Sequence, residues 1–167
     1  ITAKSAPVFG GVYKLAAVED EQGNIIPKIK ISENTAKITN PHYKKLYRFY
    51  DNESGKALAD ELCVYDETID STKPHTIFDP DAIWKTKTLT DYTARELHVT
   101  VFKNGELVYK QPSLYEIRIY CAEQLETLWD EVKRFENPHT YYVDLSKKLW
   151  DIKNELLEKS KDGKNLK

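Results

Sequence analysis

The sequence predicts an α+β domain in which an antiparallel sheet built from hairpins is followed by two C-terminal helices. Three β-prone runs in the first two-thirds of the chain are each interrupted by turn residues. In the last third the apolar residues recur at spacings of three and four, which is the period of a helix face. Strands first and helices last is the order expected of an α+β domain.

The expected hairpins turn at residues 21–24, 51–55 and 104–105. Asn104-Gly105 is the strongest of these signals, because both central positions of such a turn need a positive φ. The strands expected around the three turns are 12–18 with 25–31, 47–50 with 57–64, and 98–102 with 106–109. Residues 66–81 contain two prolines and few periodic apolar residues, and we expect a long surface loop there.

Two helices are expected in the last third. Ser113 and Glu116 have the spacing of a capping box, which starts the first helix, and Asn137-Pro138 ends it. The second is expected over residues 144–159. The first helix should bury Leu114, Ile117, Cys121, Leu125, Leu128, Val132 and Phe135, and the second Leu145, Leu149, Ile152 and Leu156.

Composition is that of an ordinary globular domain. The chain has 167 residues, of which 40% are hydrophobic and 31% charged. It fits one domain, or one small domain with an arm, and is long enough to bury a core. No apolar run approaches the roughly 20 residues that span a bilayer. No signal peptide pattern is visible at the front, and we expect a cytoplasmic protein with no membrane partner.

Charge is unevenly distributed along the chain. The net charge is −2, yet residues 1–50 carry eight Lys and Arg against four Asp and Glu. Residues 43–50 interleave bases with aromatic side chains, as platforms for single-stranded nucleic acid do. The same alternation is typical of a half-buried strand. The slightly acidic total favours the strand over a nucleic-acid site.

Metal and nucleophile signals are weak. Cys63 and Cys121 have no C-x-x-C partner, and we interpret them as buried thiols in a reducing compartment, with a disulfide as the alternative. Cys121 lies on the apolar helix stripe, which favours a core position over a nucleophile. The four histidines have no metal-ligand spacing. They are His42, His75, His98 and His139.

The paired carboxylates and the tryptophans could serve either the structure or the function of the protein. Asp60-Glu61 and the Asp79/Asp81 cluster suggest acid–base chemistry, but such pairs are more often solvated, and we expect no catalysis there. The tryptophans are expected to be core or interface anchors rather than ligand cages. They are Trp84, Trp129 and Trp150.

The front of the chain contains one further signal. Gly10-Gly11 opens an expected strand and lets backbone approach a neighbour closely, and Lys14 follows. A glycine pair alone is not a dinucleotide fingerprint. The chain starts at Ile1 and contains no methionine, so we interpret it as the C-terminal piece of a longer protein.

Several stretches carry a family resemblance that runs nearly from end to end. They are Gly10-Gly11-Val12-Tyr13-Lys14-Leu15 and residues 27–34, 45–51, 89–90, 94–97 and 129–146. Through them the chain resembles the C-terminal portion of bacterial nicotinate phosphoribosyltransferases. The last stretch is the longest and the most specific.

The resemblance implies a type II phosphoribosyltransferase, with an α/β barrel followed by a C-terminal domain. Members join nicotinate to 5-phosphoribosyl 1-diphosphate, giving nicotinate mononucleotide and diphosphate for NAD biosynthesis. ATP hydrolysis through a phosphohistidine drives the step, with Mg²⁺. The family's phosphohistidine, nicotinate-binding arginine and phosphate loop lie upstream of what matches here. This chain is therefore expected to hold no catalytic residue and to bind neither ATP nor Mg²⁺ by itself.

The same resemblance implies a domain division and a set of partners. Residues 1–24 would be the last barrel strand and its connection, and residues 25–167 the C-terminal domain. Lys14 is the one residue expected near substrate phosphates, with a lysine facing solvent or a dimer partner as the alternative. The expected partners are the N-terminal barrel of the same polypeptide and a second copy in a homodimer.

Two other functions stay open at this stage. One is a stand-alone binding module for nucleic acid or protein, using the basic front half. The other is an oligomerisation element that associates through the helices bearing Trp129 and Trp150.

Overall fold

The computed structural model describes residues 11–34 and 37–164, and these form two compact units. One unit comprises the residues up to Tyr43 together with those from Ile152 onward, and the other comprises Lys44–Asp151. In the first, strands β1 (Ala17–Glu19) and β2 (Ile25–Pro27) pair antiparallel. Gly23 takes a φ of 83° in the turn between them, which explains a glycine at that position.

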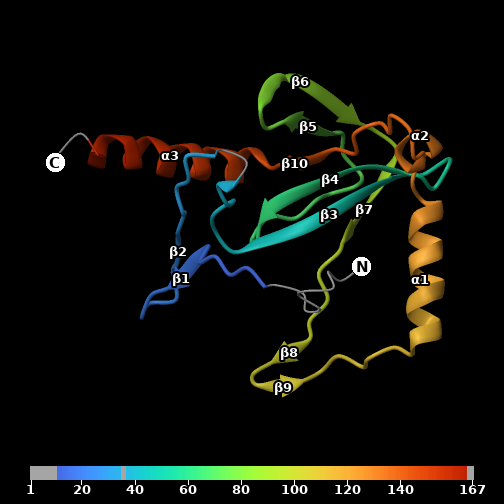
Figure 1. Ribbon diagram of the computed structural model, residues 1–167, viewed down its shortest axis with the longest axis horizontal. Coiled ribbons are helices and arrows are strands. Elements are labelled where there is room, and N and C mark those ends of the chain that lie inside the picture. The colour runs from blue at the N-terminus through green and yellow to red at the C-terminus, as the bar shows by residue number, and fades with distance from the viewer. Residues whose placement is uncertain (1–10, 35–36, 165–167) are drawn as a thin grey trace, which may run out of the picture. The chain divides into compact units, whose positions relative to one another are not determined.

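A four-stranded sheet is the centre of the second unit (Figure 1). Its order is β10-β4-β3-β7, and only the β10–β4 pair is parallel. The strands are β3 (Lys44–Asp51), β4 (Ala57–Val64), β7 (Tyr92–Glu96) and β10 (Val143–Leu145). The β3–β4 connection is the expected hairpin, with Gly55 at a φ of 68°.

Two further hairpins belong to this unit. Strands β5 (His75–Asp79) and β6 (Ala82–Leu89) pair antiparallel, as do the two-residue strands β8 (Phe102–Lys103) and β9 (Glu106–Leu107). Asn104 and Gly105 both have a positive φ, as their turn requires. The expectation of a loop through residue 81 is wrong for β5, because pairing with β6 gives that segment a strand conformation.

The core lies between the sheet and the β5–β6 hairpin. Phe49 and Tyr92 meet edge to face with ring centroids 5.5 Å apart. The buried cluster consists of Phe49, Ala59, Ile77, Leu89 and Tyr92. Tyr47 and Phe49 are buried on β3, so this strand is half-buried as expected, and these two aromatic side chains are not available for stacking on bases.

The helices depart from expectation in two ways. The first expected helix is broken into α1 (Leu114–Glu126) and the single turn α2 (Asp130–Lys133), because Trp129 between them is extended. Helix α3 (Lys147–Lys164) begins three residues late, since Val143–Leu145 pair with β4 instead. The α+β class and the capping box of Ser113 and Glu116 are confirmed.

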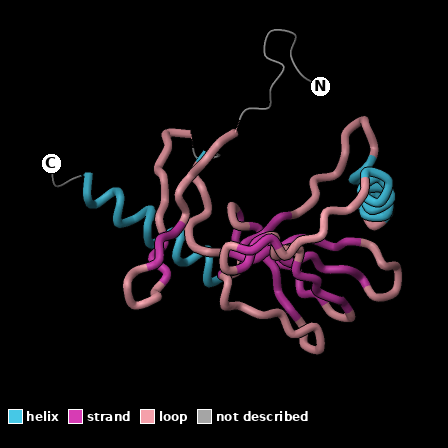
Figure 2. The backbone as a smooth tube through the Cα atoms, turned by 90° about the horizontal axis from the view of Figure 1, so that it is seen from below, coloured by secondary structure: helices cyan, strands magenta, loops and turns pink. Residues whose placement is uncertain are grey.

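Burial of the first helix was predicted wrongly. No residue of α1 is buried, and Cys121 is exposed, whereas Cys63 is buried; both are free thiols. In Figure 2 α1 is seen end-on beside the strands. Leu145, on β10, and Leu149, in the first turn of α3, are buried as expected, whereas Ile152 and Leu156 are only partly buried. Within the part of the chain that the structure describes, no helix is long and apolar enough to cross a membrane.

Candidate functional site

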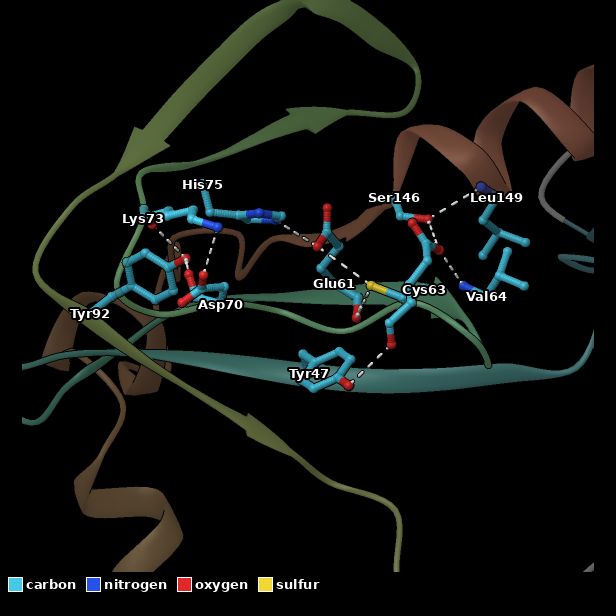
Figure 3. A network of polar contacts seen from close by, with 11 residues as sticks. Tyr47, Glu61, Cys63, Val64, Asp70, Lys73, His75, Tyr92, Ser146 and Leu149 are labelled. Carbon is cyan, nitrogen blue, oxygen red and sulfur yellow. Dashed lines mark hydrogen bonds and ion pairs between the residues drawn. The ribbon is translucent and has the colours of Figure 1, made fainter.

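A polar network lies where β4, the β5 strand and the start of α3 come together (Figure 3). It borders an open hollow of about 620 Å³, which the loop before β5 closes on one side. Glu61, Asp70 and His75 face this hollow, with Tyr92 and Ser146 at its walls. Polar side chains therefore meet here from five segments: β4, the loop before β5, β5 itself, β7 and the residue that precedes α3.

Glu61 is the buried centre of the network. Its side chain is 2% exposed, and its Oε2 lies 2.8 Å from Nε2 of His75. A carboxylate only accepts, so the histidine nitrogen donates this bond. The thiol of Cys63 contacts the same oxygen at 3.5 Å. The imidazole stacks on Phe49 with centroids 5.1 Å apart, which ties the pair to the apolar core.

This burial corrects the expectation that Asp60-Glu61 is solvated. Both carboxylates are almost fully buried, at 4% and 2% exposure. Neither is an unpaired buried charge, because each accepts hydrogen bonds from side chains elsewhere in the fold. Burial and the nearby Glu61 carboxylate also raise the pKa of Cys63, so its thiol is a poor nucleophile.

Glu67 attaches the start of α3 to the sheet. Its Oε2 accepts from the amide of Val64 at 2.6 Å and from the hydroxyl of Ser146 at 2.7 Å. The Ser146 oxygen in turn accepts from the amide of Leu149, as the cap of a helix start does. One carboxylate thus fixes both the end of β4 and the first turn of the helix.

Asp70 organises the loop before β5. Donation from the Thr72 hydroxyl, followed by Lys73 and the Thr72 amide, lowers the pKa of Asp70 to about 2. The Lys73 ammonium lies 3.0 Å from this carboxylate. Tyr92 donates its hydroxyl to the backbone oxygens of Asp70 and Lys73. The loop is therefore held to the core by backbone as well as side-chain bonds.

A second buried cluster centres on the neighbouring Asp60. Arg48 donates to both carboxylate oxygens, at 2.7 and 2.8 Å, and Tyr141 donates to one of them at 2.8 Å. Pairing with Asp60 raises the pKa of Arg48 above its ordinary value. Burial and the bond to Asp60 raise the pKa of Tyr141. This bidentate cluster holds the approach to β10 against the sheet.

Asp144 on β10 is a buried carboxylate that lies close to two others. It is 4% exposed, and it stands opposite Glu61 in the parallel register. Burial first, and the carboxylates of Glu61 and Asp79 second, raise its pKa to about 6. It borders a separate hollow of about 230 Å³ that Lys85 and Lys87 also line.

The other residues singled out from the sequence are dispersed. Lys14 precedes β1 rather than lying in a strand, and its ammonium donates to the Lys37 carbonyl at 2.6 Å. Its role toward substrate stays a prediction, and Gly10 lies outside the described residues. Of the histidines only His75 enters the network; His98 accepts from the Leu46 amide. Among residues 11–34 and 37–164, no three His, Cys, Asp or Glu are grouped to hold a metal ion.

The tryptophans differ in their surroundings. Trp150 packs edge to face on Phe78 and donates its indole N–H to the Pro80 carbonyl, so it anchors α3 to the β5–β6 hairpin. Trp84 and Trp129 are 77% and 41% exposed and do not belong to the core.

Residues 43–153, which contain both buried clusters, match the family model described as the nicotinate phosphoribosyltransferase C-terminal domain. The chain belongs to this family. The resemblance inferred from the sequence is thereby confirmed, and the stretch 129–146 that carried it supplies Tyr141, Asp144 and Ser146 to the clusters.

Relatives of the family extend well beyond the matched region. Nicotinate phosphoribosyltransferase of Bacillus subtilis is 37% identical over 96% of this chain but only 33% of its own length. The protein of that name from Dictyostelium discoideum is 32% identical over 93% of this chain and 27% of its own. The chain therefore spans between about a quarter and a third of the length of these relatives.

A solved structure agrees with this placement. The crystal structure of human nicotinic acid phosphoribosyltransferase superposes with a TM-score of 0.64 at 26% identity. The superposition covers 71% of this chain and 24% of the human one. The fold described above is thus that of the C-terminal domain in the family.

Sequence reasoning missed most partners within the network of this family domain. Arg48 and Asp60 are 12 residues apart, and Glu61 and His75 are 14 apart, so no local motif reveals them. One signal was available: charged residues inside the β-prone runs 47–50 and 57–64 need partners if the strands are central.

We predict that Arg48→Met lowers the free energy of unfolding by about 3 kcal/mol, because Asp60 is left buried with only Tyr141 as donor. Lys45→Met on the same strand is the control. Its ion pair with Glu96 is longer, at 3.7 Å, and more exposed, so the loss should stay below about 1 kcal/mol. Urea unfolding monitored by circular dichroism measures both, and equal losses would contradict the account.

Because the pKa of Asp144 is raised in the folded state, we predict that the free energy of unfolding falls as the pH rises. This pKa is about 6 in the folded state against the ordinary 3.8, so the folded state binds more protons between these values. The favourable contribution is complete below about pH 4 and is lost once the pH has passed 6. Asp144→Asn should therefore stabilise the protein by up to about 3 kcal/mol at pH 8 and change little at pH 4. The exposed Asp81→Asn, measured by the same urea unfolding, is the control for the removal of a surface carboxylate.

Proposed function

We propose that this chain acts as the C-terminal domain of an enzyme that makes nicotinate mononucleotide from nicotinate and 5-phosphoribosyl 1-diphosphate. The observation that carries the proposal is the family match over residues 43–153. The Bacillus subtilis relative, whose name states the activity, aligns over 96% of this chain. The reaction would be a step of NAD biosynthesis, coupled to ATP hydrolysis and dependent on Mg²⁺.

Within that enzyme we assign the domain a supporting role. The buried carboxylates of Glu61 and Asp60 and the half-buried carboxylate of Glu67 already accept bonds from donors of this chain. Groups satisfied in this way fix a fold rather than bind a transferring phosphate, which needs unengaged cationic or N–H donors. We therefore expect the catalytic residues, ATP and Mg²⁺ to be located in the rest of the enzyme.

Lys14 is the one residue of the chain that we keep as a candidate for contact with substrate. Its ammonium is partly exposed and is already engaged by the Lys37 carbonyl. A phosphate would have to replace this carbonyl or share the three donors of the ammonium with it. We further expect the whole enzyme to be a cytoplasmic homodimer.

Activity assays of two polypeptides test the function. The polypeptide encoded by the complete gene should convert nicotinate, 5-phosphoribosyl 1-diphosphate and Mg-ATP to nicotinate mononucleotide, measured by chromatography. The 167-residue chain alone should form none, because we expect the groups that stabilise the diphosphate leaving group in the rest of the enzyme. Nicotinamide in place of nicotinate is the control substrate and should not be converted. Turnover by the 167-residue chain, or none by the complete polypeptide, would contradict the proposal.

A further inference from the structure

Helix α1 is apolar on more than one side, yet none of its residues is buried. At 100° per residue, Ile117 and Leu125 share one face while Ile119 lies on another. A helix with apolar residues on several sides is normally enclosed in a core. The large apolar side chains of α1 are between 40% and 74% exposed: Leu114, Tyr115, Ile117, Ile119, Tyr120 and Leu125.

The β8–β9 hairpin continues this apolar surface. Phe102 and Leu107 are 65% and 64% exposed. Together with Tyr109 and Ile117 they line one hollow of about 440 Å³, so hairpin and helix share a groove. We call the exposed apolar residues between 99 and 125 the α1–hairpin surface. Figure 1 shows the hairpin beyond the N-terminal end of α1, away from the sheet.

Helix α1 is capped at its start and bonded to other elements of the fold at its end. At its start, Ser113 and Glu116 satisfy each other's amides in the capping box. At its end, Gln124 accepts from Arg95 at 2.8 Å, and Lys56 donates to the Glu126 carbonyl at 2.6 Å. The surface is therefore preformed, which lowers the ordering cost of whatever covers it.

The occupant must cover several sides of the helix together with the hairpin groove. A second copy related by a two-fold axis would press one self-complementary patch against the same patch, and would leave the other side of α1 in water. A larger body of the same polypeptide has enough surface to enclose it. The chain spans 33% of the Bacillus subtilis relative, so about two-thirds of that protein lies outside the matched region.

We propose that the α1–hairpin surface packs against the region that precedes this domain in a nicotinate phosphoribosyltransferase polypeptide. The inference rests on the proposed function. The facing surface should be built of aliphatic and aromatic side chains with few charges, because Ile117, Phe102 and Leu107 offer few polar partners. This contact would join the domain to the part of the enzyme that carries out the transfer.

The reactivity of the Cys121 thiol reports whether this surface is covered. Cys121 lies on α1 and is exposed, whereas Cys63 is buried and has a raised pKa that makes it unreactive. Labelling by N-ethylmaleimide, read by mass spectrometry at the peptide containing Cys121, should be about tenfold or more slower in the polypeptide encoded by the complete gene than in the 167-residue chain. Equal rates would overturn the proposal. If labelling of Cys121 in the 167-residue chain becomes slower as the concentration of that chain rises, a second copy covers the surface and the proposal is also overturned.

Two matched variants of the complete polypeptide sharpen the test. Ile117→Glu should restore fast labelling of Cys121 because it places a charge in the contact. Ile83→Glu is the control, since Ile83 is similarly exposed, at 50% against 44%, but lies on β6. Equal effects of the two would contradict the assignment of the surface. If nicotinate mononucleotide forms while Cys121 labels freely, the proposed contact is wrong and the proposed function stands. If Cys121 is protected but no nicotinate mononucleotide forms, the contact stands and the function is wrong.

Discussion

Two successive carboxylates buried on one central strand are the constraint on which this domain depends. Asp60 and Glu61 lie on β4, between β3 and β10, and consecutive side chains of a strand point to opposite faces. Each must find donors on its own face. Arg48 and Tyr141 supply them on one, and His75 on the other. Residues from three distant parts of the sequence are thereby fixed to one strand.

Much of the remaining architecture follows from this arrangement. The bond from Tyr141 leads the chain into β10, whose short parallel pairing with β4 ends at Leu145. Ser146 then caps α3 while bonded to Glu67. Burial of Asp144 beside Glu61 is the unfavourable consequence, seen in its raised pKa. Tight attachment of β10 costs the domain stability at neutral pH.

The features that could be predicted from the sequence are those that depend on residues close together in the chain. The Asn104-Gly105 turn, the capping box at Ser113 and the half-buried strand β3 depend on neighbouring residues, and all three are confirmed. Strands β5 and β10 and the partners of Asp60 and Glu61 depend on pairings made across the fold. The apolar spacing through Cys121 predicted a buried helix face, and this is wrong for the described chain, in which no residue of α1 is buried.

Family membership and the exposed helix together lead to one central proposal: the sheet is complete within this chain, while α1 is covered by another part of a longer polypeptide. Hydrogen–deuterium exchange, compared between the 167-residue chain and the polypeptide encoded by the complete gene, tests this most directly. We predict equal protection of the β3 and β4 amides in both, and protection of the α1 amides that is about tenfold or more greater in the complete polypeptide. Equal exchange of α1 in the two, or a sheet protected only in the complete polypeptide, would contradict the account.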